Sequence, residues 1–280
     1  IKDYLSAFGI GQKKIDDLLE KLYFQNRPSI LQTPRYLEMI AELVEKEGVE
    51  KLKTISRGEL FEKFIYKKIN IESEKTNEQN CQEIIKRVLE KLALIMEIYQ
   101  ANQITKDELM EFFDDTKSSL NVIFLNQVPI NYFYERSLLK DNIDSIEFEN
   151  TEFQEYLAAK EILRLGRVEQ VIFDLAVVRD LGEIHPSWIN TLSFLIESEI
   201  NILKNVFEYV FLNPQSVHIE ENIRLLTKNN VEKLAIEDKK NVFKMVYSYY
   251  QNTGHWIDYD VAEKLSFYYD VSLDEYIERH

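Results

Sequence analysis

The chain has 280 residues, of which 45% are hydrophobic and 30% are charged. It can therefore bury one large core or two to three smaller ones, which excludes a disordered protein. Seven glycines and five prolines are few for this length, and they favour helices over a turn-rich β fold. The net charge of −15 repels phosphate backbones, so we expect no nucleic-acid partner.

The single cysteine, Cys81, excludes an intramolecular disulfide and a cysteine-based zinc cluster, and it fits the reducing cytoplasm. No apolar run has the length of a membrane span or resembles a secretory signal, so we expect no membrane partner. The chain begins at Ile1 instead of Met, which predicts that it is a fragment of a longer protein.

Apolar residues at helical spacing predict amphipathic helices in the first part of the chain. One stripe covers 15–22, and a second covers 37–44 in a helix with Pro34 in its first turn. Ser56 and Glu59 have the spacing of a capping box that opens a third helix. Residues 72–80 carry no apolar period, which predicts a linker and a hinge there.

A longer helix is predicted from about Gln82, with an apolar face that extends to Tyr99. Thr105 and Glu108 form a second predicted capping box. Two short strand-like runs then lie on either side of Asp141-Asn142, and Ile146 and Phe148 alternate with glutamates in the second run. Helices followed by one small hairpin predict a winged helix.

After the hairpin, Thr151 and Gln154 have capping-box spacing and predict a helix over 153–165, with Gly166 as its left-handed terminator. Ala158 and Ala159 would allow a close approach of another helix. Helical patterns continue to the chain end, with stripes at 188–196 and 242–249 and a last predicted capping box at Ser272 and Glu275. We expect irregular helix pairs stacked as a short solenoid.

The predicted fold is mainly α. It comprises a helical domain over 1–75, a winged-helix domain with a small β-hairpin over 76–166, and an irregular α-helical sensor or repeat region over 167–280.

Residues with catalytic spacing are missing from the sequence. It contains no GxxxxGK[ST] phosphate loop and no GxSxG nucleophile elbow, and Gly9 and Gly11 are read as a loop. The four histidines have no metal-ligand spacing, and the many acidic residues are read as solvated helix faces. We therefore expect neither catalysis nor a metal site in this chain.

The segment FENTEFQEYLAA, residues 148–159, closely resembles the F-x-H-x-T-F-Q-E-Y-L-A-A signature at the end of the winged helix in NACHT-type STAND NTPases. Other segments agree in order. PSILQTPRYLEMIAEL resembles the helix just after the ATPase core, ISRGELFEKFI resembles the next helix, and YLSAFGIGQKKIDDLLEKL is similar to the last segment of the core. The helix with Trp188 resembles the one that opens the superhelical sensor. The resemblance covers residues 1–200.

This resemblance implies a regulatory, non-catalytic region of a signalling or defence ATPase. The Walker loops, with ATP or ADP and Mg, would belong to an ATPase core in the missing N-terminal part. Pro34 matches a proline that packs on the adenine nucleotide. Asn150 takes the place of a histidine that reaches the ADP phosphate, and Glu152 takes the place of a threonine. An amide donates a hydrogen bond but carries no positive charge.

The partners implied are the protein's own ATPase core, an unidentified protein trigger, and further copies of the protein when it is activated. An alternative is an α-helical scaffold without a nucleotide link. It would bind a protein through the tyrosines and tryptophan of 247–259, which exceed what one helix stripe can hide. Winged-helix DNA binding is disfavoured, because the hairpin over 139–150 is net acidic.

Overall fold

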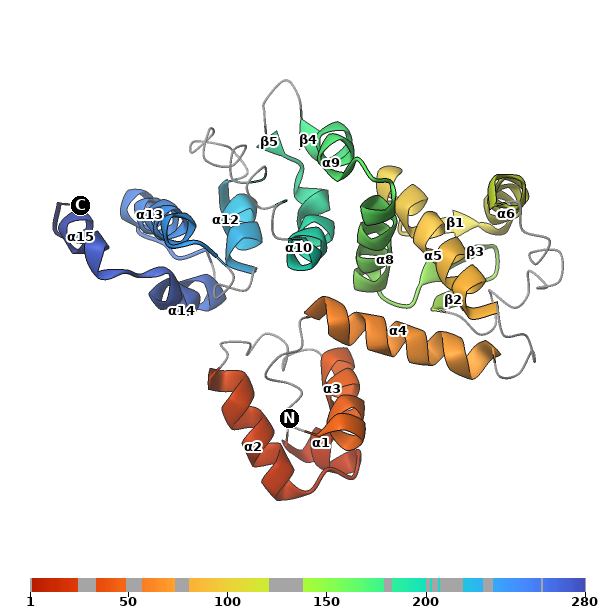
Figure 1. Cartoon of the computed structure of the whole chain (residues 1–280), viewed down its shortest axis with the longest axis horizontal. Coiled ribbons are helices and arrows are strands. Elements are labelled where there is room, and N and C mark those ends of the chain that lie inside the picture. Colours follow the sequence, from red (N-terminus) through yellow and green to blue (C-terminus); the bar gives the residue numbers. More distant parts are fainter. Residues whose placement is uncertain are drawn as a thin grey trace. The chain divides into compact units, whose positions relative to one another are not determined.

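The computed structural model describes residues 2–24, 34–48, 57–73, 81–120, 138–178, 183–199, 202, 206, 219–228, 234–257 and 259–279. The protein is mainly helical, as the sequence predicted, and the predicted hairpin is part of a small three-stranded antiparallel sheet (Figure 1). The backbone contacts group residues 1–64 with 231–280 in one compact unit and residues 65–230 in another. The three-domain division drawn from the sequence stays a prediction.

Four helices are described in the first part of the chain, of which the last three were predicted and the first was not. They are α1 (Lys2–Ala7), α2 (Gln12–Phe24), α3 (Pro34–Glu47) and α4 (Arg57–Ser73). Helix α1 packs on α2 and α3 through a core that contains Leu5, Ile15 and Val44. Helix α4 continues to Ser73, so the predicted linker is helical at its first two positions, and its remainder, 74–80, lies outside the described residues, as does the predicted cap Ser56.

The second unit includes the end of α4 from Ile65 on, and a helix, a short strand and another helix follow it. These are α5 (Cys81–Ile98), β1 (Gln103–Thr105) and α6 (Lys106–Leu120). The predicted capping box is confirmed, because Thr105 N donates to Glu108 Oε2 over 2.8 Å and Glu108 N donates to Thr105 Oγ1 over 3.2 Å. Tyr99 was wrongly predicted on the buried face of α5: it follows the end of the helix and is 78% exposed.

The predicted hairpin is confirmed as β2 (Leu139–Asp141) and β3 (Ser145–Phe148). Asp141 belongs to strand β2, so the turn lies at 142–144, where Asn142 N donates to Ser145 O over 2.9 Å. Ile146 and Phe148 are buried, as their alternation predicted. The short strand β1 was not predicted, because three residues are too few to show alternation.

The three strands pair in the order β1-β3-β2, and both pairs are antiparallel. Ile104 of β1 lies opposite Ile146 of β3, and Leu139 of β2 lies opposite Phe148. A helix, a strand, a second helix and then a hairpin whose second strand pairs with the first strand are arranged as in a winged helix. The stretch 121–137 between α6 and β2 lies outside the described residues.

Helix α8 (Thr151–Arg164) follows the hairpin directly and packs on α5 and on α10 (Ile189–Ser198). Ala158 and Ala159 are completely buried on α8, which agrees with the predicted close helix approach. Gly166 has a φ of +69° just after the helix, as its predicted role as a left-handed terminator requires.

Smaller elements lie between α8 and α10, and the first helix and both strands among them were not predicted. They are α9 (Val168–Ala176), the strands β4 (Val177–Val178) and β5 (Glu183–Ile184), which pair with each other, and the short 3-10 helix η4 (Pro186–Trp188). Helix α12 (Ile219–Lys228) packs on α10. These contacts bury the predicted stripe with Trp188, Leu192 and Leu195.

The last described elements are α13 (Ile236–Thr253), α14 (Tyr259–Tyr268), the 3-10 helix η6 (Val271–Leu273) and α15 (Asp274–Arg279). Helix α13 packs on α14, and Val242 and Val246 of its predicted stripe are buried. The predicted capping box of Ser272 and Glu275 is wrong, because Ser272 lies inside η6 and its N–H donates to Asp270 Oδ1 over 2.9 Å. Aspartate caps as well as serine and here precedes the turn.

Candidate functional site

The junction between strand β3 and helix α8 contains Asn150, one of the two predicted nucleotide contacts. Asn150 is the N-cap of α8, with extended backbone angles, and its Oδ1 accepts a hydrogen bond from Glu152 N over 2.8 Å. The predicted capping box of Thr151 and Gln154 is therefore wrong. Thr151 is the exposed first residue of the helix, and Gln154 is buried. Asparagine is at least as good a cap as threonine, and the helix starts at Thr151, two residues earlier than expected.

The cap uses only Oδ1 of the Asn150 side chain, so its Nδ2 can still donate a hydrogen bond. No described residue accepts a hydrogen bond from Asn150 Nδ2, and the side chain is half-buried. The preceding Glu149 lies close to it, and its carboxylate forms an ion pair of 2.5 Å with Lys68 of α4. The negative charge of Glu149 is thus balanced locally. An anion at this junction would meet an amide donor and the positive end of a 14-residue helix.

The apolar residues of the segment 148–159 bury themselves at this junction. Phe148 is the last residue of β3, and Phe153, Tyr156 and Leu157 belong to α8. Each of these four side chains is at most 5% exposed. The Tyr156 ring meets Phe194 of α10 edge-on, with 5.3 Å between the ring centroids. These side chains therefore join the hairpin, α8 and α10 into one packed core.

A group of buried polar side chains connects the three helices α5, α8 and α10. Glu97 of α5 accepts hydrogen bonds from Gln154 Nε2 of α8 over 3.1 Å and from Thr191 Oγ1 of α10 over 2.9 Å. Gln154 also donates to Ala101 O over 3.3 Å. Burial raises the pKa of the Glu97 carboxyl, and the two hydrogen bonds partly oppose that rise.

A second buried group of charges also connects α5 with α8. Arg87 forms ion pairs with Glu90 and with Glu161, and Arg164 also contacts Glu90. The two glutamates are almost completely buried. Sequence reasoning missed these residues. A usable signal existed, since Glu90 and Glu97 are seven residues apart and so lie on one face of a helix whose neighbouring positions are apolar.

Buried carboxylates with shifted pKa values are common in functional sites. Here every oxygen of Glu97 is held by a protein donor inside the core, and the charges around Arg87 neutralise one another. We assign both groups to the packing of α5, α8 and α10, not to catalysis.

Pro34, the other predicted nucleotide contact, is the first residue of α3, as expected for a proline in a first helical turn. Its side chain lies outside the described part of the structure. Pro34 and Asn150 belong to different compact units, and their roles in nucleotide binding stay predictions.

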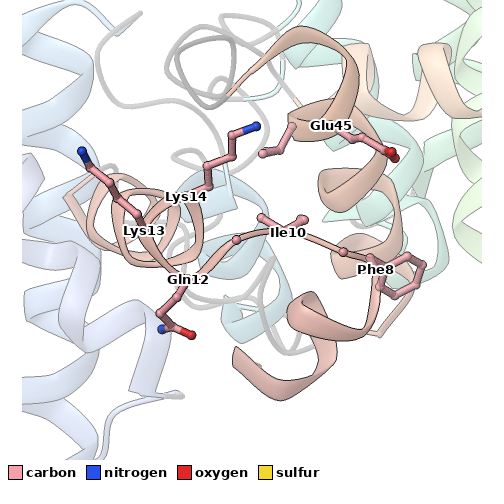
Figure 2. Close-up of a pocket in the computed structure, with 9 residues that line it drawn as sticks. Phe8, Ile10, Gln12, Lys13, Lys14 and Glu45 are labelled. Atoms are coloured by element: carbon pink, nitrogen blue, oxygen red, sulfur yellow. The ribbon is translucent and has the colours of Figure 1, made fainter.

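The loop between α1 and α2 borders a cavity of about 300 Å³. Ile10 and Val44 form its apolar floor, and Phe8 lies at its rim. Figure 2 shows that Gln12, Lys13 and Lys14 point in different directions from the first turn of α2. Ligand sites usually carry a few polar groups that converge on one point. The described residues that line this cavity do not form such a group, and we assign it no chemistry.

Among the described residues, no group of three or more His, Cys, Asp or Glu side chains could hold a metal ion. His185 caps η4, since its Nδ1 accepts from Ser187 N over 3.3 Å, and His255 is exposed. The other two histidines lie outside the described ranges. None of the helices within those ranges is long and apolar enough to cross a membrane.

Comparisons with known proteins found no match: neither a protein-family model, nor a curated protein, nor a solved structure matches this chain.

Proposed function

We propose that this chain is the regulatory region of a NACHT-type STAND NTPase, a nucleotide-dependent conformational switch in signalling or antiviral defence. The observation that supports this proposal best is the position of the segment 148–159. It runs from the last strand of a winged-helix arrangement into α8, and the position matched to the nucleotide-sensing histidine is the N-cap of that helix. The chain itself performs no catalysis in this proposal.

In the proposed switch, the N-terminus of α8 lies over a nucleotide phosphate and forms a cover on it. Asn150 Nδ2 and the first N–H groups of α8 would donate to the phosphate, while the Lys68–Glu149 ion pair offsets the nearest negative charge. Glu152 in the first turn of α8 opposes this attraction. The cover would therefore bind a nucleotide more weakly than the histidine of the family signature does. A weak contact suits a switch that must open when a trigger binds.

The proposed partners lie outside this chain. The ATPase core of the same protein would hold ATP or ADP with Mg, and an unidentified protein trigger would bind the helices after the winged helix. Opened copies would then associate into a homo-oligomer. Such a protein would work in the cytoplasm.

The decisive first experiment is to read the gene upstream of Ile1. A GxxxxGK[ST] motif, followed by a strand that ends in acidic residues, would support the proposal. An upstream sequence without them would refute it.

A second experiment separates the capping role of Asn150 from its nucleotide role in the extended protein. The Asn150→Asp variant keeps a cap acceptor but replaces the donor with a negative charge. We expect unchanged thermal stability and an ADP affinity lowered about tenfold, which corresponds to about 1.4 kcal/mol. The Asn150→His variant should raise ADP affinity. Equal ADP affinity for all three proteins would show that this position does not contact the nucleotide.

An α-helical scaffold without a nucleotide link is the second candidate. The observation that favours it is the exposure of large apolar side chains in the C-terminal helices, where Tyr259 is 82% and Val271 is 72% exposed. ADP that co-purifies with the extended protein would speak against this candidate as the whole function.

A further inference from the structure

Six aromatic rings on and beside the C-terminal helices form two groups of ring contacts, which we together call the aromatic stripe. Its members are Phe243, Tyr247, Tyr250, Trp256, Tyr269 and Tyr276. The first three are spaced by four and three residues, so they follow one face of α13. The rings of Phe243 and Tyr247 stack with 5.8 Å between centroids, and those of Tyr250 and Trp256 stack with 4.2 Å between centroids.

The other two rings border the same face. Tyr269 lies 6.1 Å from Phe243, and Tyr276 lies 6.1 Å edge-on from Tyr247, both measured between ring centroids. Ser248 of α13 and the hydroxyl of Tyr276 are 2.7 Å apart, which fixes α15 against this face. The stripe is thus a defined arrangement and not a set of scattered rings.

Much of the stripe faces solvent. Tyr269 is 45% exposed and Trp256 is 40% exposed, while Tyr247, Tyr250 and Tyr276 are half-buried. Val242 and Val246 of α13 and Leu265 and Tyr268 of α14 are buried, and Phe243 is the buried member of the stripe. Five large rings therefore remain partly exposed although the core has other residues to fill it, which is typical of an interaction surface.

The charges around the stripe select the kind of partner. Between Ile236 and Arg279 the sequence has nine acidic and five basic residues. Asp270 and Asp274 adjoin Tyr269, whose hydroxyl donates to Asp274 Oδ1 over 2.5 Å. That hydrogen bond raises the pKa of the Tyr269 phenol, so the hydroxyl keeps its proton and continues to donate to Asp274.

One lysine of the protein already contacts a ring of the stripe. The Lys244 ammonium lies over the Tyr276 ring, 5.7 Å from the centroid. Aromatic faces attract ammonium and guanidinium groups, and arginine stacks on them more often than lysine does. Nucleic-acid bases also stack on aromatic rings, but they need a cationic groove for the phosphates, and the surroundings here are acidic.

We propose that the aromatic stripe binds an arginine-rich polypeptide segment of a partner protein, with guanidinium groups stacked on the exposed rings and paired with Asp270, Asp274 and neighbouring acids. This surface is independent of the nucleotide link proposed above.

The test uses the whole 280-residue chain and a short fluorescent peptide of alternating arginine and glycine, with fluorescence anisotropy as the readout. We expect saturable binding, weaker binding of the lysine–glycine peptide, and none of the glutamate–glycine peptide or of oligothymidylate. The arginine peptide should also change the emission of Trp256, because Trp188, the other tryptophan, is buried.

Variants that keep the net charge separate stacking from simple attraction to an acidic protein. Trp256→Ala and Tyr269→Leu should each lower the affinity about two- to fivefold, and the double variant about tenfold. The matched control is Tyr259→Ala, which removes an equally large ring that is 82% exposed but lies outside the stripe. It should bind as the unaltered protein does.

Circular dichroism and the thermal midpoint of each variant show that it is folded, and Trp256→Ala tests the stripe at a loop position if Tyr269→Leu is destabilised. Equal affinities of the folded Trp256→Ala variant and the unaltered protein would overturn the proposal, because charge alone would then explain the binding. The proposal also fails if the arginine peptide does not bind, or if oligothymidylate binds as tightly.

Discussion

The hydrogen bond from Thr191 of α10 to Glu97 of α5 is expected to stabilise the packing of these helices. The Thr191→Val variant keeps the side-chain shape and removes only the hydroxyl, so it creates no cavity. Thr191 is completely buried, and its Oγ1 lies 2.9 Å from Glu97 Oε1. The variant therefore leaves one carboxylate oxygen buried without this donor. A hydrogen bond to a charged group contributes about 1.5–3 kcal/mol, so we expect a loss of about 2 kcal/mol in the free energy of unfolding at neutral pH.

The assay is urea unfolding followed by tryptophan fluorescence in a Trp256→Phe background. The remaining tryptophan, Trp188, directly precedes α10 and is buried, so its emission reports this part of the protein. Thr227→Val is the matched control. The Thr227 hydroxyl is also buried, but it donates to Ile223 O of its own helix, which is neutral, and we expect a loss of less than about 0.5 kcal/mol.

The loss in Thr191→Val should also depend on pH, because an ionised carboxylate accepts a stronger hydrogen bond than a protonated one. It should shrink as the pH falls below the raised pKa of Glu97. A loss below about 0.5 kcal/mol at neutral pH, or one equal to that of Thr227→Val, would refute the view that this hydrogen bond supports the junction.

Three further predictions concern other buried or strained positions. The Arg87→Ala variant should lower the free energy of unfolding by about 3 kcal/mol in urea titrations, since it leaves Glu161 in the core without this cation, whereas Arg279→Ala at an exposed ion pair should cost less than about 0.5 kcal/mol. For Glu97, whose folded-state pKa is raised above 4.5, the folded state binds more protons than the unfolded state between these two pKa values, so stability should fall as pH rises through that window. The Glu97→Gln variant should not show this fall, and a stability–pH profile identical to that of the unaltered protein would contradict the assignment. The Gly166→Ala variant should cost about 1 kcal/mol in thermal unfolding through its φ of +69° alone, as no atom lies within 4 Å of the added Cβ, and Gly11→Ala, at a position without positive φ, should be close to neutral.

Hydrophobic spacing in the sequence was sufficient to predict most helices. The predicted stripe of α3 is buried, and so are most described members of the stripes of α2, α5 and α13, because an amphipathic helix has only one face that can enter a core. Local signals were reliable where the interacting groups are neighbours in the chain. The capping box of Thr105 and Glu108 and the terminator Gly166 are examples. The hairpin after α6 was also predicted, since its alternation of apolar and acidic residues is local.

Other features needed the tertiary structure, because their partners are distant in the chain. Strand β1 exists only through its pairing with β3, some 40 residues later along the chain. In the sequence, Gln154 looked like the partner of Thr151 in a capping box. In the structure its side-chain amide donates to Glu97 and Ala101, and Asn150 is the N-cap. The sequence by itself determined most of the longer helices and the hairpin that precedes α8. Only the folded chain decided which polar side chains are buried together, because the cost of burying a charge is met by donors from other helices and not by its own neighbours.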